Sequence, residues 1–256
     1  MADRETQNGS GLKAVVVSDL HMFSRRSEFH SHLDAIHSAA RDADLFIFNG
    51  DTFDFKWTVL PSVLQTVEAA VLWLQELCEQ HRDTRFHFIL GNHDNLQLFI
   101  DELSQLSLQT ENLAWHPYYL RIGDVAFLHG DVSDRLMDAA ALERSRENWL
   151  HDTKVRHPVY HNIYDAVMLT GVHKVIQRVV YPKKRVARRI VNYLEDVGLG
   201  RVDGIKHVYF GHTHGAMRDF EHQGMYFHNP GTPMRGMDFQ ILEVEVHPVA
   251  EDEYGG

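Results

Sequence analysis

Short runs of β-branched and aromatic residues recur along the chain and predict strands. These runs are 13–17, 45–48, 86–90, 125–128, 208–210, 225–227 and 239–246. Apolar residues at helical spacing predict helices over 28–41, 61–81 and 95–106, between the early strands. This β-α-β-α-β opening favours a parallel sheet covered by helices. A hairpin around Gly123, over 115–127, adds antiparallel character, as in two sheets packed face to face with helices outside.

The segment 132–206 interrupts this pattern because it is poor in strand-forming runs. Helical spacing recurs within it at Leu169, Val172, Val175, Ile176 and Val179, and again at Val186, Ile190, Val191 and Leu194. Pro182 separates two of the predicted helices. The segment contains 14 Lys and Arg against 9 Asp and Glu, although the whole chain has a formal charge of −11. We therefore expect one domain over 12–256, with 132–206 as a helical insertion within it, and a disordered tail over 1–11.

Composition narrows the class of protein. The chain of 256 residues is 44% hydrophobic and 24% charged, with 17 Gly and 7 Pro, which is typical of a soluble globular protein. Apolar runs are too short to cross a bilayer, and the first residues lack the apolar core of a secretory signal, so we expect a cytoplasmic protein. The acidic balance argues against stable nucleic acid binding. The single cysteine, Cys78, excludes an intrachain disulfide, whereas the 19 histidines suggest a metal site.

Five predicted strands are each followed by polar residues of the types that bind metals. These motifs are Asp19-Leu20-His21, Asn49-Gly50-Asp51, Gly91-Asn92-His93-Asp94, His129-Gly130-Asp131 and Gly211-His212-Thr213-His214. The crevice beyond the carboxyl ends of strands is where α/β sheets gather reactive groups from distant segments. We therefore expect these motifs to form one site.

The chemistry of this set indicates divalent cations. Carboxylate, amide and imidazole ligands without a thiolate suit Mn, Fe, Zn, Co or Ni better than a Ca or Mg cage. Seven candidate ligands exceed the needs of one ion, and a carboxylate such as Asp51 is able to bridge two. A pair of cations clamps phosphoryl oxygens and lowers the pKa of a water between them, which is typical of a hydrolase.

In order and spacing, the five motifs resemble those of the calcineurin-like metallophosphoesterase superfamily. Asn229-Pro230-Gly231-Thr232 resembles its closing turn. The resemblance implies a four-layer α/β/β/α sandwich and two metal ions, with Mn the first expectation. It also implies roles for the candidate residues: Asp19, His21 and His214 hold one metal, Asn92, His129 and His212 hold the other, and Asp51 bridges them. Asn92 and His93 contact the substrate, His93 protonates the leaving oxygen, and Asp94 orients His93.

Within that superfamily, Ser18-Asp19-Leu20-His21, the block from Asn49 to Asp54 and the helical insertion resemble the UDP-2,3-diacylglucosamine diphosphatases. The chain departs from that group in having His93 where it usually has Arg, and Gly215-Ala216 where it has Arg-Pro. The basic run 181–189 then suggests peripheral contact with an anionic membrane. Two alternatives stay open: a phosphodiesterase or phosphohydrolase acting on soluble nucleotides, and a metal-free interaction scaffold of the same fold.

Overall fold

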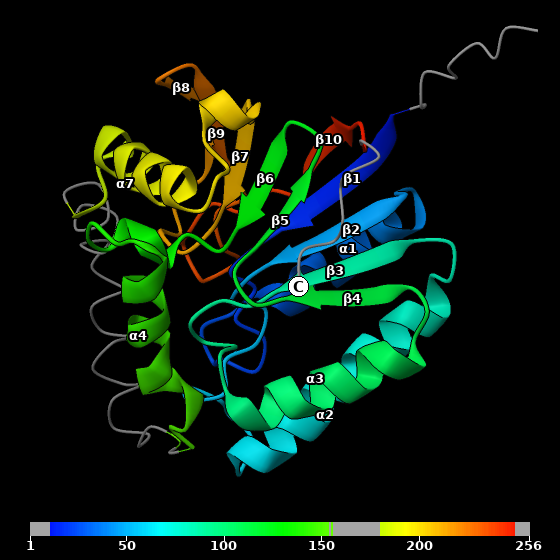
Figure 1. Ribbon diagram of the computed structural model, residues 1–256. Coiled ribbons are helices and arrows are strands. Elements are labelled where there is room, and N and C mark those ends of the chain that lie inside the picture. Colours follow the sequence, from blue (N-terminus) through cyan, green and yellow to red (C-terminus); the bar gives the residue numbers. More distant parts are fainter. Residues whose placement is uncertain (1–10, 154, 156–179, 249–256) are drawn as a thin grey trace, which may run out of the picture.

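The computed structural model describes residues 11–153, 155 and 180–248 (Figure 1). Within these residues the chain forms two five-stranded sheets that face each other. The predicted tail and the helical spacing at 169–179 lie outside the described residues, apart from Gly11.

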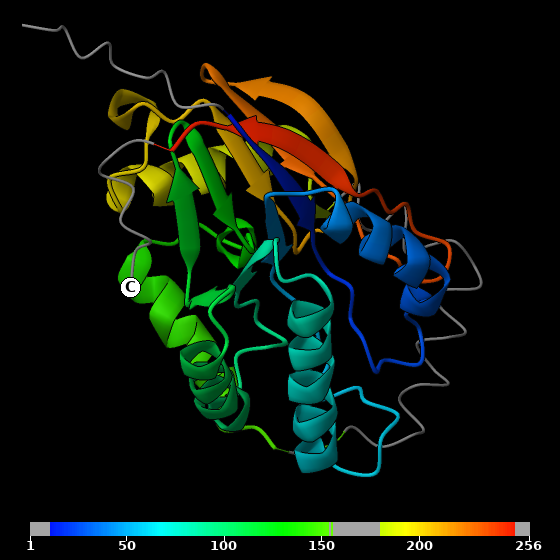
Figure 2. The ribbon, with the colours of Figure 1, turned by 90° about the vertical axis from the view of Figure 1, so that its right-hand side faces the viewer.

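The first sheet is parallel except at one edge. Its strands, in spatial order, are β10 (Leu242–Val246), β1 (Leu12–Val17), β2 (Leu45–Asn49), β3 (Arg85–Ile89) and β4 (Leu113–His116). Only β10 runs antiparallel to its neighbour, with Ala14 opposite Val244. Figure 2 shows β10 alongside β1 although the two come from opposite ends of the chain.

The second sheet is mixed. Its order is β5 (Tyr119–Ile122), β6 (Val125–Leu128), β7 (His207–Phe210), β9 (Met225–Asn229) and β8 (Met217–His222). The predicted hairpin around Gly123 is β5–β6, but it is shorter than expected. Trp115 and His116 belong instead to β4 of the first sheet, and the chain passes between sheets at Pro117. Proline has no amide hydrogen for a sheet hydrogen bond, which suits it to that crossing.

Helices cover the outer faces of both sheets. The described α-helices are α1 (Leu33–Arg41), α2 (Val63–Gln80), α3 (Gln97–Gln109), α4 (Ala139–Leu150) and α7 (Lys183–Asp196). Three short 3-10 helices are Phe29–His32, Asp131–Ser133 and Arg201–Asp203. The predicted helix over 28–41 is thus a 3-10 turn followed by α1. Among the described residues, no helix is both long enough and apolar enough to span a bilayer.

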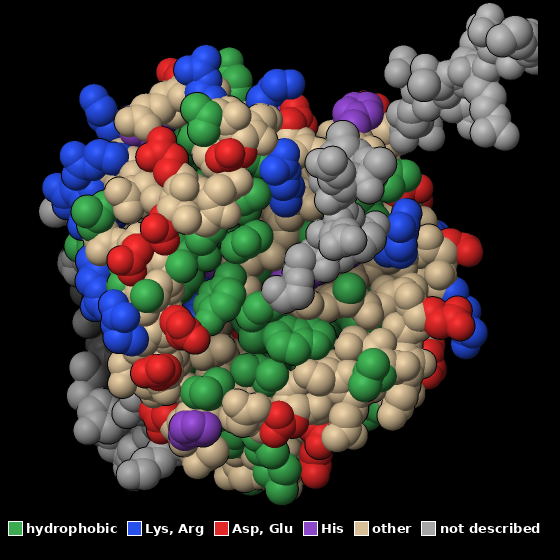
Figure 3. Space-filling view, viewed as in Figure 1, with side chains coloured by type: hydrophobic (Ala, Val, Ile, Leu, Met, Phe, Trp, Pro, Cys, Tyr) green, Lys and Arg blue, Asp and Glu red, His purple; other side chains and the backbone are tan. Residues whose placement is uncertain are grey.

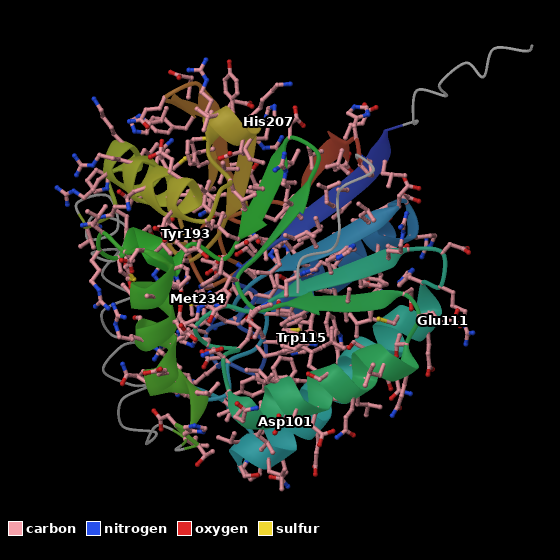
Figure 4. All side chains as sticks on the ribbon, in the orientation of Figure 1. Asp101, Glu111, Trp115, Tyr193, His207 and Met234 are labelled. Atoms are coloured by element: carbon pink, nitrogen blue, oxygen red, sulfur yellow. The ribbon has the colours of Figure 1, made fainter. Side chains whose placement is uncertain are left out.

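Alternating side chains build separate layers of core. On β1, Val15 and Val17 pack with the helices, whereas Ala14 and Val16 pack against the second sheet. Figure 4 shows Trp115 between β4 and helix α3, and it packs on the helix-side cluster. The outer face of the second sheet packs against α7 through residues such as Ile190. These layers confirm the predicted α/β sandwich with two sheets and outer helices.

The described residues between β6 and β7 contain helices and no strand, as the sequence pattern predicts. A buried ion pair ties this segment to the core: Nε and Nη2 of Arg146 on α4 donate to the Asp131 carboxylate at 2.8 and 3.0 Å. Arg146 also donates to the backbone oxygen of Pro117. These bonds fix α4 beside the carboxyl ends of the strands.

Candidate metal centre

The five strand-end motifs meet at one edge of the sandwich. Loops after β1, β2 and β3 carry Asp19 and His21, Asp51, and Asn92 to Asp94, while loops after β6 and β7 carry His129, His212 and His214. β1, β2 and β3 are parallel to one another, and so are β6 and β7, so each set of loops leaves its sheet on one side. Contacts between the two sets, described below, join them into a single cluster.

Most of the candidate ligands have an unusual backbone conformation. The left-handed region is costly for residues other than glycine, and it recurs at functional sites. Five candidate ligands adopt it: Asp19, His21, Asp51, His212 and His214, with φ of 52°, 44°, 52°, 64° and 56°. The surrounding contacts must compensate for the cost of these conformations.

Glycines allow the loops to approach each other closely. A Cβ at Gly50 would overlap the His129 ring, and one at Gly91 would overlap the carboxylate and backbone nitrogen of Asp51. At Gly211 a Cβ would overlap the side chain of Ser18. The glycines beside the candidate ligands are therefore required by contact between loops.

One group of candidate ligands contains Asp19, His21 and His214. Their donor atoms converge, with His214 Nε2 at 3.1 Å from His21 Nε2 and 3.4 Å from Asp19 Oδ1. Asp19 is fully buried and is held from several sides. Its carboxylate accepts from the His212 backbone amide at 3.0 Å and from the Ser18 hydroxyl, while Thr232 Oγ1 donates to its backbone oxygen at 2.7 Å.

A second group contains Asp51, Asn92, His129 and His212. His129 Nε2 lies 3.3 Å from Asp51 Oδ2, 3.2 Å from Asn92 Oδ1 and 3.3 Å from His212 Nδ1. His212 Nδ1 lies 3.1 Å from the same Asn92 oxygen. Asp51 connects the two groups because its Oδ2 is also 3.9 Å from His21 Nε2. All seven sequence-predicted ligands therefore lie in one cluster, with Asp51 between the groups.

The cluster fits a pair of divalent cations. Asp19 and Asp51 are buried, and in the described residues their ion pairs are with histidines and not with Lys or Arg. Buried carboxylates need a compensating positive charge. Oxygen and imidazole donors without a thiolate are the ligands that Mn, Fe, Zn, Co and Ni accept. The lone pairs that converge here would bind such ions directly.

His93 lies beside the first group, and its partner is a residue that the sequence analysis did not single out. The His93 and His21 rings meet edge to face with centroids 4.8 Å apart. Asp54 Oδ1 lies 3.2 Å from His93 Nδ1, and Asp54 Oδ2 lies 3.6 Å from His21 Nδ1. Burial opposes protonation, but the charges of Asp54 and Asp51 raise the pKa of His93 to about 9. Asp54 is thus the carboxylate that faces the Nδ1 side of the His93 ring.

Asp94 has a different position from the one expected. Its carboxylate accepts from the backbone amides of Thr52 and Phe53 at 3.1 and 2.8 Å, on the loop that carries Asp51. The structure thus replaces Asp94 with Asp54 as the partner of the His93 ring. A sequence signal was present, since Asp54 follows Asp51 by three residues on the same tight loop. Asp94 instead fixes the shape of that loop.

Residues from the predicted insertion reach the cluster on two sides. Asp134 Oδ1 lies 2.8 Å from His212 Nε2 and accepts from the Tyr181 hydroxyl at 2.6 Å. A carboxylate behind a metal-binding imidazole fixes which ring nitrogen stays free to bind, here Nδ1. On the other side, Trp149 on α4 packs against His93 with centroids 5.1 Å apart, and Lys56 Nζ lies 3.7 Å from the Trp149 centroid. These contacts were not predicted from the sequence.

A comparison with protein families places the candidate ligands within one known family. A family model described as calcineurin-like phosphoesterase matches residues 12–216, a stretch that includes every candidate ligand. No curated protein matches the chain. One similar solved structure is a phosphopantetheinyl hydrolase from Mycobacterium tuberculosis, at 14% identity and a TM-score of 0.47, covering 92% of this chain and 96% of that one. Another is a dimetal phosphatase from Danio rerio, at 10% identity and a TM-score of 0.43, covering 94% and 98%.

Proposed function

The chain belongs to the calcineurin-like phosphoesterase family, and on that premise we propose that it is a dinuclear metal-dependent hydrolase of phosphoric esters or diphosphates. The observation that carries the proposal is the position of Asp51. Its Oδ2 faces His129 of one ligand group and His21 of the other, at 3.3 and 3.9 Å. One carboxylate shared by two adjacent groups favours two ions over a single isolated one.

The residues would divide the work as follows. Asp19, His21 and His214 would hold one cation, Asn92, His129 and His212 would hold the other, and Asp51 would be shared between them. When bound, the pair supplies Lewis acidity toward phosphoryl oxygens and lowers the pKa of water. Mn is the first expectation, with Fe, Zn, Co and Ni as the alternatives.

His93 would act as general acid at the leaving oxygen. Asp54 holds the Nδ1 side of its ring, at 3.2 Å, so Nε2 is the nitrogen left to face substrate. Trp149 covers part of the same ring and limits the access of water to it. A positioned imidazole of this kind typically contributes about 10²–10⁴-fold to rate.

For the substrate we propose a UDP-linked lipid such as UDP-2,3-diacylglucosamine, cleaved at its diphosphate. Helix α7 supports this proposal because Tyr181, just before its start, contacts Asp134 at the site, and the helix exposes Lys183, Lys184, Arg185 and Arg188. Figure 3 shows Lys and Arg side chains along the left edge of the molecule, where Figure 1 places α7. A basic helix next to a phosphoesterase site suits an anionic lipid surface or a diphosphate. We also propose that 132–206 forms a lid within the domain 12–256.

The test is release of UMP from UDP-2,3-diacylglucosamine by purified protein with added Mn²⁺, with bis(p-nitrophenyl) phosphate in parallel. Asn92→Ala removes the amide oxygen that contacts His129 and His212 and should abolish turnover of both. Asn192→Ala, exposed on α7, is the matched control and should keep full activity. Hydrolysis of the generic ester alone would reject the lipid and favour soluble nucleotides.

The competing hypothesis is a metal-free interaction scaffold, and metal analysis distinguishes it from the hydrolase. The hydrolase should retain close to two divalent ions per chain after dialysis against Mn²⁺, and Asn92→Ala should retain fewer. Near-zero metal in both proteins, with no turnover of either ester, would reject the hydrolase and leave the scaffold.

A further inference from the structure

Lys56 is a buried cation outside the candidate metal centre. It is only 6% exposed, and lysine is almost never buried to this degree unless it is paired. It lies on the loop after β2, five residues after Asp51. Phe55, just before it, packs in the helix-side core, and the backbone amide of Trp57, just after it, donates to Asp54 Oδ1 at 2.9 Å. Lys56 therefore extends from a firmly held stretch of loop.

The Lys56 ammonium makes two contacts at the end of α4. Its Nζ lies 2.9 Å from Asp152 Oδ2 and 3.7 Å from the centroid of the Trp149 ring. A cation within about 6 Å of an indole face is attracted by the negative charge of that face. The side chains of Lys56 and Asp152 are 7% and 26% exposed, so the ion pair is largely shielded from water. Lys56 thus joins the end of α4 to the loop that carries Asp51.

A hydrogen bond ties the same helix to the loop after β3. Asn95 Nδ2 donates to the backbone oxygen of Arg146 at 3.0 Å, and Asn95 is itself buried. Arg146 and Trp149 are about one helical turn apart on α4. Two loops of the candidate site therefore hold the helix at neighbouring points, and together they set the position of Trp149.

Trp149 packs against the His93 ring, with centroids 5.1 Å apart. The backbone of His93 is fixed separately, because its amide donates to Asp51 Oδ1 at 2.8 Å. Asp54 contacts the ring at Nδ1, and His21 meets it edge to face. A contact at one nitrogen still lets a ring tilt about that point, whereas packing against a second aromatic ring restricts the tilt. The position of Trp149 therefore helps to determine where His93 Nε2 points.

We propose that Lys56 is a positioning residue for His93, that it acts through Trp149, and that it determines how well the protein hydrolyses esters with poor leaving groups. This inference rests on the proposed hydrolase function. As the P–O bond breaks, its electron pair goes to the leaving oxygen, which takes the proton from His93 Nε2. Water supplies the new oxygen on phosphorus, and the proton that it loses restores His93 through solvent. A poor leaving group needs this proton, whereas p-nitrophenolate leaves readily without it.

Two esters that share the retained methyl group isolate the effect of the leaving group: methyl phenyl phosphate and methyl p-nitrophenyl phosphate. With Mn²⁺-loaded protein, Lys56→Met should lower kcat for the phenyl ester about tenfold or more and for the p-nitrophenyl ester less than about twofold. Lys56→Arg keeps a cation and should restore most of the lost rate. Lys206→Met removes an exposed lysine paired with Asp124 at 3.0 Å, and as the matched control it should change neither rate.

A double variant tests whether Lys56 acts through Trp149. Trp149→Leu should show the same selective loss with the phenyl ester, and Lys56→Met/Trp149→Leu should be no slower than Trp149→Leu alone. Equal losses with both esters in Lys56→Met would indicate a purely structural role and overturn the proposal. Additive losses in the double variant would overturn the action through Trp149.

Fluorine NMR of protein labelled with 5-fluorotryptophan gives a readout that needs no turnover. The Trp149 resonance, identified by its loss in Trp149→Leu, should shift in Lys56→Met and in His93→Ala but not in Lys206→Met. An unchanged Trp149 resonance in Lys56→Met would overturn the proposal whether or not any ester is hydrolysed. Both shifts without turnover of either ester by the wild type would reject the hydrolase, while the contacts from Lys56 through Trp149 to His93 would stand.

Discussion

The buried pair of Arg146 and Asp131 gives the sharpest stability prediction. Both residues are almost fully buried, at 3% and 7% exposure, and Arg146 makes two hydrogen bonds to the carboxylate and one to Pro117. Arg146→Met leaves Asp131 buried without its cation. Removing one partner of a buried pair costs about 3–5 kcal/mol, because the remaining charge cannot be solvated.

The double variant Asp131→Leu/Arg146→Met should be more stable than Arg146→Met alone. It removes the stranded charge and leaves the lost bond to the Pro117 oxygen, which costs about 1–2 kcal/mol. Arg144→Met, exposed on the same helix, is the matched control and should change stability by less than about 0.5 kcal/mol.

Urea denaturation of EDTA-treated protein, followed by circular dichroism, measures these differences without a contribution from metal binding. A loss below about 1 kcal/mol in Arg146→Met, equal to that of the control, would refute the reasoning. It would mean that water reaches Asp131 and that α4 is held to the core by other contacts.

Three further predictions concern the site and the core. Asp54→Asn should lower kcat by about 10-fold or more, because His93 loses the carboxylate that orients it; unchanged kcat would exclude that role. Gly91→Ala should lose bound metal by elemental analysis, since the added Cβ overlaps Asp51. Burial, reinforced by a neighbouring histidine, lowers the pKa of His87 to about 3, so the folded state keeps this ring neutral. Below about pH 6.5 the unfolded chain takes up a proton at His87 and the folded chain does not, so this contribution to stability is complete above about pH 6.5 and is lost as the pH falls toward 3. Between pH 6 and pH 5 the free energy of unfolding should therefore fall by about 1 kcal/mol less in His87→Leu than in the wild type.

The local sequence was enough to predict most of the strands and the polar, metal-binding residues that follow them. Alternation within β1 sends Val15 and Val17 to the helices and Ala14 and Val16 to the other sheet, which is why the layers were predictable. Each candidate ligand lies on the loop that follows a strand, so its placement at the sheet edge follows from chain geometry. β4 and β8 escaped prediction. β8 has a largely exposed outer-edge pattern, and β4 is short and adjoins the crossing at Pro117.

Contacts between distant segments required the tertiary structure. The pairing of Asp54 with His93 depends on how two strand-end loops approach each other, and Arg146 meets Asp131 only because α4 folds back onto the core. The contacts of Lys56 with Trp149 and Asp152 likewise join segments that share no sequence signal. Residue types near strand ends thus determine which chemistry is available, because local geometry fixes where they point. Which carboxylate serves which imidazole is decided by packing, because that depends on distances no local pattern encodes.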